Sequence, residues 1–415
     1  MNKLFTSLPV WLISALVSMA ICHSAQATDD LAGLWDASIK CKGGEIKFGL
    51  DLEKSASGWQ AHLVNGEERI KIPTVEVTES SVRLRIDHYD SELKFQVDQN
   101  ATGPKLNGKW KKRRGPDKWS SMTCSAVPHD ATSKSKLESP TGFNGRWAVK
   151  FESSDDPAVG VFNQRTNSNQ VLGTFLTTTG DYRFLAGGVQ GGQLELSCFD
   201  GAHAFLFKAK RDQQGNLIGD FWSSAAWHET WSANLDPQAN LPDDFKQTII
   251  VEGVELGAMS FPDLNGKLTK LDDPKFAGKA RIIYVFGSWC PNCHDAGAYF
   301  ATLDKKYRDQ GLSILGLAFE LTGDFDRDAA QVKTYLGRHG SNYPVLVAGL
   351  SDKAEASKSL PILDRVRSYP TTIFLDGQGQ VTAVHTGFTG PATGEAYELL
   401  KAKFERLIQR ELKKN

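Results

Sequence analysis

The chain has little that would explain attraction to nucleic acid, a metal ion or a lipid surface. Its 48 Lys and Arg side chains against 49 Asp and Glu leave a formal net charge of -1, which removes a general electrostatic argument for nucleic acid or anionic membrane. The sequence has a single C-x-x-C and no H-x-x-H, so a closed structural zinc site lacks its second pair of ligands. One dense basic run, Lys109 to Arg114, ends in Gly-Pro and is interpreted as the solvated end of a hairpin.

Residues 1–27 have the layout of a secretory signal peptide. A lysine near the start is followed by an apolar stretch and then by Ala25-Gln26-Ala27, a small-x-small cleavage site. The mature chain would then begin at Thr28, although residues 4–22 are almost long enough to serve as an uncleaved membrane anchor. No later segment is apolar enough to cross a bilayer. We therefore predict a periplasmic or cell-envelope protein in an oxidising compartment, where cysteines are disulfide partners or redox catalysts.

Long helical periodicity is also missing between Leu31 and about Leu235. This region alternates short apolar and polar segments broken by Gly, Asn and Asp, which is typical of antiparallel strands and tight turns. It also repeats itself, so we predict two copies of one β domain, at residues 28–127 and 140–240, joined by a polar stretch. Three tryptophans recur in the second copy at one constant offset, as Trp35 with Trp147, Trp110 with Trp222, and Trp119 with Trp231.

The repeat suggests roles for the cysteines of the β region. Cys41 and Cys124 fall near the first and last strands of the first copy, where the second copy has Ser153 and Asp236. We predict a Cys41–Cys124 disulfide, which in the chain-entropy model stabilises by roughly 4 to 5 kcal/mol. Cys198 is left over and is interpreted as a buried free thiol.

A different pattern begins at about residue 250. A nearly continuous apolar strand, "KARIIYVFGSW", is followed by helical spacing over residues 291–310 that ends at Gly311. Strands and helices then alternate, with a final hairpin, "TTIFLD" and "VTAVHTGF", before a last helix. We predict an α/β domain over residues 250–415, with a central, partly antiparallel sheet covered by helices.

The C-x-x-C motif lies at the first strand-to-helix junction of this domain. The spacing alone fits a redox dithiol, a c-type haem attachment site or half of a zinc site. At a helix N-terminus the free N–H groups and the helix dipole favour a thiolate, so Cys290 is predicted to be the nucleophile and Cys293 the resolving thiol, joined as a redox-active Cys290–Cys293 disulfide when oxidised. His294 completes a literal C-x-x-C-H, but an α/β setting with only Met122 and Met259 outside residues 1–27 disfavours haem.

Residues 250–415 resemble the thioredoxin-fold domain of exported TlpA/ResA-like thiol-disulfide oxidoreductases. The resemblance depends on "GSWCPNC", on "LGLAFE" and on "SYPTTIF". It implies a cis bond between Tyr369 and Pro370, beside the cysteines. It also implies that a glutamate at the end of the next strand, here Glu320, carries the proton of the resolving thiol; a strand-end glutamate facing water is the alternative. Thioredoxins themselves have a buried acid where this chain has Tyr284.

The resemblance also supplies the remaining site residues and a function. Trp289, Pro291, Tyr369 and Thr371 are expected to shape the substrate site, and no metal or organic cofactor is expected. The protein is expected to exchange disulfides with protein substrates, as a reductase fed by a membrane-embedded thiol reductant and without a nucleic-acid partner. The alternatives are a thiol peroxidase, and an envelope binding or assembly protein whose dithiol is a switch.

Overall fold

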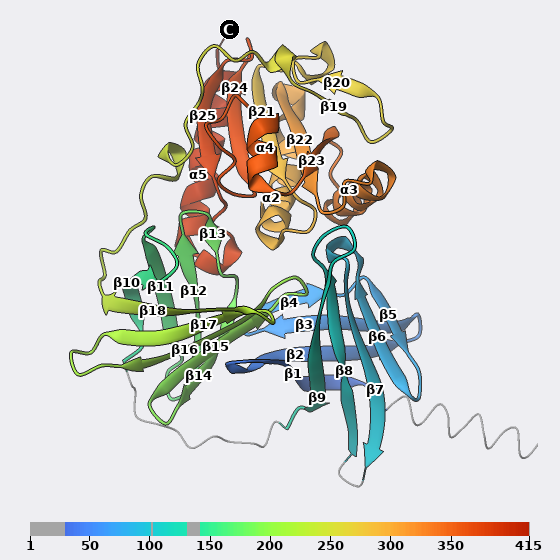
Figure 1. The fold of residues 1–415 in the computed structure, drawn as a ribbon, viewed down its shortest axis with the longest axis vertical. Helices are drawn as coiled ribbons and strands as arrows, with labels where there is room; N and C mark the ends of the chain where they lie inside the picture. Colours follow the sequence, from blue (N-terminus) through green and yellow to red (C-terminus); the bar gives the residue numbers. More distant parts are fainter. Residues whose placement is uncertain (1–29, 101–102, 131–141, 415) are drawn as a thin grey trace, which may run out of the picture.

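The computed structural model describes residues 30–100, 103–130 and 142–414 (Figure 1). The predicted signal peptide and most of the predicted linker lie outside these ranges. In the described part, two β units are followed by a C-terminal unit in which strands and helices alternate, and the predicted fold class is confirmed. None of the described helices is long and apolar enough to cross a membrane.

The first β unit is one nine-stranded sheet in the order β4-β3-β2-β1-β9-β8-β7-β6-β5. All its pairings are antiparallel, and alternate residues are buried, as in the β6 sequence SVRLRI. The elements are β1 (Gly33–Cys41), β2 (Gly44–Ser55), β3 (Gly58–Asn65), β4 (Glu68–Lys71), β5 (Thr74–Val77), β6 (Ser81–Ile86), the short 3-10 helix η1 (Asp87–Tyr89), β7 (Ser91–Asn100), β8 (Gly103–Arg113) and β9 (Trp119–Pro128).

The second β unit repeats this arrangement with nine strands, again with its first strand paired to its last. An added pairing of β11 with β12 closes the sheet on itself, whereas the first sheet stays open. The elements are β10 (Gly145–Phe151), β11 (Ala158–Gln164), β12 (Gln170–Thr177), β13 (Gly180–Asp181), β14 (Leu185–Gln190), β15 (Gln193–Phe199), β16 (Ala204–Arg211), β17 (Leu217–Ser223) and β18 (Trp227–Leu235).

The tryptophan repeat is correct for one pair and wrong for another. Trp35 and Trp147 are both buried, and each indole N–H donates to the carbonyl oxygen four residues earlier, at 3.1 Å. Trp119 and Trp231 are not equivalent, because Trp119 is 51% exposed at the start of β9 while Trp231 is buried within β18. The residue that begins β18, Trp227, is also 51% exposed and takes the same place at the start of its strand as Trp119.

The cysteines of the β units are free thiols in the structure. The predicted Cys41–Cys124 disulfide is not formed there: Cys124 on β9 pairs with Ile39, two residues before Cys41 on β1, so the two thiols are diagonal neighbours rather than opposite each other. Burial raises the pKa of Cys124 to about 12. Cys198 is buried and free, as predicted.

The C-terminal unit is built on a five-stranded sheet in the order β23-β22-β21-β24-β25, with β21, β22 and β23 parallel and the last two pairings antiparallel. Aromatic side chains of α2 pack against α5, as in the contact of Tyr299 with Phe404. The elements are β19 (Ser260–Pro262), β20 (Leu268–Lys270), β21 (Ala280–Phe286), α2 (Pro291–Tyr307), β22 (Leu312–Glu320), α3 (Phe325–His339), β23 (Val345–Leu350), α4 (Lys353–Ser359), β24 (Thr371–Asp376), β25 (Val381–Thr386) and α5 (Glu395–Leu412).

The buried tryptophan of the first unit can be tested against its exposed neighbour. We expect Trp35→Ala to lower the free energy of unfolding of this unit by about 3 to 5 kcal/mol, because it leaves a cavity and an unpaired Leu31 carbonyl. Trp119→Ala removes an exposed ring that only stacks on Arg113 and should cost at most about 1 kcal/mol. Urea unfolding followed by near-UV circular dichroism measures both; equal losses would contradict this packing.

Candidate active site

Cys290 lies where β21 gives way to α2, at the N-cap of the helix. Pro291 is the first helical residue, which suits a position whose N–H has no partner inside the helix. Cys290 is only 8% exposed. Burial raises the pKa of its thiol, but the Cys293 thiol, the N–H groups of Cys293 and Asn292, and the charge of Lys112 outweigh it, so the net pKa lies below its ordinary value. The surroundings of the sulfur therefore favour the thiolate more than those of an ordinary cysteine do.

Cys293 is fully buried one turn along α2. Burial, together with the hydrogen bond between its thiol and that of Cys290, raises the pKa of the Cys293 thiol well above the ordinary value. Its carbonyl oxygen accepts hydrogen bonds from the hydroxyls of Tyr284, at 2.7 Å, and Tyr335, at 2.8 Å. Tyr284, which stands where thioredoxins have a buried acid, thus anchors the backbone of the second cysteine. The two thiols are electrostatically unequal, as a nucleophile and a resolving thiol should be.

The predicted proline loop lies against Cys290. The Tyr369–Pro370 bond is cis, as predicted, and the Cys290 thiol lies 3.5 Å from the Tyr369 carbonyl oxygen. The Trp289 ring meets the Tyr369 ring edge to face at 5.6 Å, and its N–H donates to the Phe319 carbonyl. Thr371 is fully buried and its hydroxyl donates to the Ser368 carbonyl, so it secures this loop rather than facing outward.

Glu320 ends β22 and is 1% exposed, so the alternative of a carboxylate facing water is wrong. Its two oxygens accept from the backbone N–H of Ser288, at 2.8 Å, and from the Ser288 hydroxyl, at 2.6 Å. Burial raises its pKa to about 8, against the lowering effect of these bonds. The carboxyl group therefore holds the loop two residues before Cys290 and is protonated at neutral pH.

His294, the last residue of the C-x-x-C-H stretch, is used inside the protein. Its Nε2 lies 2.8 Å from the Ser288 carbonyl oxygen and its Nδ1 lies 2.8 Å from His339 Nε2. Burial lowers its pKa well below the ordinary value. Both ring nitrogens are engaged, so neither is offered to a haem iron. Within the described ranges, no group of three or more His, Cys, Asp or Glu side chains could hold a metal ion.

The second β unit covers the face of the C-terminal unit that carries the dithiol. We call this the dithiol face, formed by residues 290–295, 367–370 and 387–390. The segment that covers it is residues 177–183, which follow β12, include β13 and are here called the plug hairpin; in Figure 1 it rises from the green unit toward the orange and red one.

The plug hairpin meets this face through both its backbone and its side chains. The Ser368 hydroxyl donates to the Thr179 carbonyl at 2.8 Å, and the Asn292 amide donates to the Asp181 carbonyl at 3.4 Å. Gly180 and Gly387, both at positive φ, make the approach possible, because a Cβ at Gly387 would lie 2.7 Å from the Thr179 carbonyl carbon.

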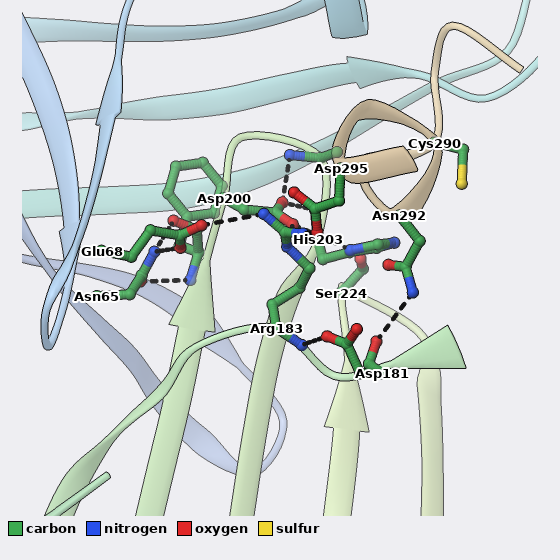
Figure 2. A network of polar contacts seen from close by, with 12 residues as sticks. Asn65, Glu68, Asp181, Arg183, Asp200, His203, Ser224, Cys290, Asn292 and Asp295 are labelled. Carbon is green, nitrogen blue, oxygen red and sulfur yellow. Dashed lines mark hydrogen bonds and ion pairs between the residues drawn. The ribbon is translucent and has the colours of Figure 1, made fainter. Parts of the chain in front are cut away.

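Arg183 joins the three units at one point (Figure 2). Its guanidinium pairs with Glu68 of the first unit at 3.0 Å, with Asp200 of the second at 3.5 Å, and with Asp295 of α2. Arg183 is 5% exposed, and the nearby Asp181 carboxylate accepts from the Gly390 N–H at 2.6 Å. Buried charges that are paired in this way oppose separation of the units, because parting them leaves carboxylates unpaired.

The first β unit reaches the same region through η1 and the end of β8. The rings of His88 and Tyr89 contact His294 at 4.9 and 4.8 Å, and Gln331 of α3 donates to the Asp87 carbonyl at 2.7 Å. The interpretation of the basic run as a solvated hairpin end is wrong for Lys112, which is 4% exposed. Lys109, Lys111 and Arg114 of the run are exposed, as expected, and Lys112 is its only buried basic residue.

Sequence reasoning therefore found the residues of the C-terminal unit and missed those that the β units bring to it. Arg183 and the rest of the plug hairpin carry no motif, and their role depends on how separate units dock. Lys112 did leave a signal: it is a lysine at an inward position of a strand whose inward neighbours are Leu106 and Trp110.

The raised pKa of Glu320 predicts a pH dependence of stability. The folded protein keeps this proton between the ordinary pKa of 4.5 and about 8 while the unfolded chain releases it, so the group's contribution is complete below 4.5 and is lost as pH rises toward 8. We expect Glu320→Gln to remove a fall of up to about 1.4 kcal/mol per pH unit in this window. Denaturant unfolding at pH 5 to 8, with exposed Glu252→Gln as control, measures it; parallel profiles for all three proteins would contradict the burial of a neutral carboxyl group.

Comparison with known proteins finds similarity for the C-terminal unit, which carries the dithiol. Residues 241–400 match the Redoxin family model. Over 142 residues the chain is 26% identical to the thiol-disulfide oxidoreductase ResA of Halalkalibacterium halodurans, covering 34% of this chain and 71% of the relative. It is 28% identical over 142 residues to the thioredoxin-like protein YneN of Bacillus subtilis, covering 34% of this chain and 75% of the relative.

Among solved structures, a putative thiol:disulfide interchange protein DsbE from Chlorobium tepidum is 19% identical, with a TM-score of 0.28, covering 37% of this chain and 92% of that one. The family and the relatives match the C-terminal unit, and the expected resemblance is confirmed for that unit. Residues 241–400 match the Redoxin family, and the C-terminal unit is similar to thiol-disulfide oxidoreductases of the thioredoxin type.

Proposed function

We propose that this protein reduces disulfide bonds in protein substrates, with Cys290 as the nucleophile and Cys293 as the resolving thiol. The observation that carries the proposal is the position of Cys290: its pKa is lowered at the start of α2, and its sulfur lies 3.5 Å from the backbone carbonyl of Tyr369 beside the cis proline. A thiolate next to the backbone of the proline loop suits attack on a disulfide carried by a polypeptide once the loop is uncovered.

The reaction moves two electrons from the dithiol to the substrate. The Cys290 thiolate attacks one sulfur of the substrate disulfide, which forms a mixed disulfide and expels the other substrate sulfur as a thiolate that takes up a proton. Cys293 then loses its proton and attacks the Cys290 sulfur. This step forms the Cys290–Cys293 disulfide and expels the second substrate thiolate. A reductant must later return two electrons and two protons.

Glu320 is proposed as the acceptor of the Cys293 proton in its ionised form, which a pKa of about 8 makes the minor form at neutral pH. Its pKa of about 8 brings it close to the range of a thiol, and its bonds to Ser288 hold it near the dithiol loop. Trp289, Pro291 and Tyr369 are proposed to border the substrate, with Pro370 presenting the loop and Thr371 securing it from behind.

The plug hairpin supports a polypeptide as the substrate class, because the dithiol face already holds a stretch of backbone. Ser368 and Asn292 donate to two of its carbonyl oxygens, which any peptide could offer in its place. With Cys290 8% exposed, the arrangement described here is a closed one. A protein disulfide would reach Cys290 only after the plug hairpin leaves the dithiol face.

Export and the electron source are further parts of the proposal. The sequence of residues 1–27 supports secretion into a periplasm or cell envelope, and the ResA-like resemblance favours a reductase supplied by a membrane-embedded thiol reductant. Rapid consumption of peroxide by the purified protein would instead favour a thiol peroxidase. A cellular role that survives loss of Cys290 would favour an envelope binding or assembly protein.

Substitution of the two cysteines tests the central reaction. We expect Cys290→Ser to abolish reduction of a model protein disulfide such as that of insulin. We expect Cys293→Ser to accumulate a mixed disulfide between Cys290 and the substrate, because no second thiol remains to attack that bond. Mass spectrometry of the trapped species identifies the attached protein, and equilibration with glutathione gives the direction of electron flow. Trapping through residue 293 in Cys290→Ser would reverse the assigned roles.

Loosening the contacts between units tests the closed arrangement. We expect Asp295→Ala, which frees Arg183 from α2, and Arg327→Gln, which removes the pair with Asp90, to raise the alkylation rate of Cys290 several-fold, since the open form becomes more populated. The rate is compared at pH 10, where a difference in ionisation matters least. Exposed Asp326→Asn on α3 is the matched control. An unchanged rate in both variants would contradict occlusion by the β units.

A further inference from the structure

Three histidines form a cluster where the first β unit contacts the helices of the C-terminal unit. His88 comes from η1, His294 from α2 and His339 from the last turn of α3. The rings of His88 and His294 meet at 4.9 Å, and His294 Nδ1 lies 2.8 Å from His339 Nε2. His88 is 1% exposed and His294 is 6% exposed. The proposed reaction uses none of these rings.

The hydrogen bonds of the cluster suit neutral rings. The Ser288 carbonyl oxygen is an acceptor, so His294 donates to it from Nε2 and, when neutral, accepts at Nδ1 from the His339 Nε2–H. A second proton on His294 would point at that same N–H. The buried Nε2 of His88 has no hydrogen-bond partner among the residues that the structure describes, so a proton there would be a buried charge without a partner.

The surroundings of the cluster also oppose protonation. Burial lowers the pKa of His88 to about 2, that of His339 to about 4, and that of His294 well below its ordinary value. The Arg338 guanidinium lowers the pKa of all three, while the charge of Asp200 favours the protonated form of His88. The other titratable or charged groups in this contact are Tyr89, Lys112, Arg183, Cys290, Cys293, Tyr335 and the ion pair of Arg327 with Asp90.

The two β units are joined to each other by buried bonds, so they are expected to move as one body. The Asn65 amide exchanges two hydrogen bonds with the backbone of Phe199, at 3.0 and 3.1 Å, and the Ser197 hydroxyl bonds both backbone groups of Lys47. The Tyr182 ring of the plug hairpin packs among the aromatic rings inside the second unit. Separation of η1 from α2 and α3 would therefore carry the plug hairpin away from the dithiol face.

We propose that this histidine cluster is a pH-sensitive latch: its neutral rings hold the first β unit against α2 and α3, and their protonation in acid releases the β units and uncovers the dithiol. The inference rests on the proposed function, because the latch controls the access of a protein substrate to Cys290. The latch is also part of the dithiol loop, since His294 follows Cys293 directly and bonds the Ser288 carbonyl two residues before Cys290.

The direction and size of the effect follow from linkage. Docked His88 stays neutral down to a pKa of about 2, whereas in the released form its pKa returns to the ordinary value of 6.5. Release therefore takes up a proton below pH 6.5, and the ratio of released to docked protein rises by up to about tenfold per pH unit for this ring alone. Between pH 7.5 and 5 the rise is about thirtyfold.

The first experiment measures the rate at which N-ethylmaleimide modifies Cys290 in the reduced full-length protein between pH 7.5 and 5, by peptide mass spectrometry. His88→Phe keeps a ring of similar size that cannot titrate, and His129→Phe, at an exposed position of the first unit, is the matched control. Ionisation of Cys290 and of the carboxylates around Arg183 is common to all three proteins and cancels in a ratio of rates. We expect the ratio of the unmodified protein to His88→Phe to rise about thirtyfold across this range, and the ratio to His129→Phe to stay constant.

Hydrogen exchange of residues 84–92 and 325–339 gives a readout that does not involve the dithiol. Protection of these segments should fall about thirtyfold more between pH 7.5 and 5 in the unmodified protein than in His88→Phe. If the two proteins lose protection equally and their ratio of modification rates stays constant, the latch is wrong. If the His88-dependent loss of protection is seen while Cys290→Ser still reduces insulin, the latch stands and the proposed function fails.

Should His88→Phe not fold, as judged by circular dichroism, an NMR titration of the histidine side chains in the unmodified protein decides. A His88 ring that stays neutral until residues 84–92 lose their protection supports the latch. A ring that titrates near pH 6.5 while those residues stay protected overturns it.

Discussion

A cysteine whose pKa is lowered although it is almost inaccessible to solvent is the constraint on which the rest of this structure depends. Burial alone would keep the Cys290 thiol protonated, so its charge must be compensated locally. The start of α2 provides N–H groups, Cys293 a thiol hydrogen bond, and Lys112 a positive charge. The neutral Glu320 carboxyl group, tied to Ser288, adds no negative charge beside the thiolate at neutral pH.

The β units also contribute to this junction. Their contacts with the Redoxin domain are polar and buried, centred on Arg183 and its three carboxylates (Figure 2). Charged interfaces of this kind are specific in geometry but not necessarily strong, since desolvation offsets much of the ion-pair energy. Such an interface would allow the plug hairpin to leave the dithiol face and to dock again in the same position.

The sequence was sufficient for the parts whose chemistry is local. The strand-to-helix junction at Cys290 follows from an apolar strand and the helical spacing after it, whereas the cis bond before Pro370 and the buried carboxyl group of Glu320 are what the TlpA/ResA-like resemblance implies. The burial of Lys112 and the role of Arg183 could not be predicted, because they depend on how separately folded units pack and no periodicity encodes that packing. Within the β units, the constant offset of the tryptophan repeat matched Trp119 of β9 with Trp231 of β18, which are not equivalent. Two sheets can keep the same strand order while corresponding strands differ in length and register.

The account's central claim is that Cys290 is ionised near neutrality although it is almost inaccessible to solvent. The most direct measurement is a pH titration of the Cβ chemical shift of Cys290 by NMR, in reduced protein labelled at cysteine and assigned with Cys290→Ser. The account predicts a midpoint clearly below that of an ordinary thiol, about 8.5. A midpoint at or above that value would contradict it, because burial would then have prevailed over the helix N-terminus and Lys112.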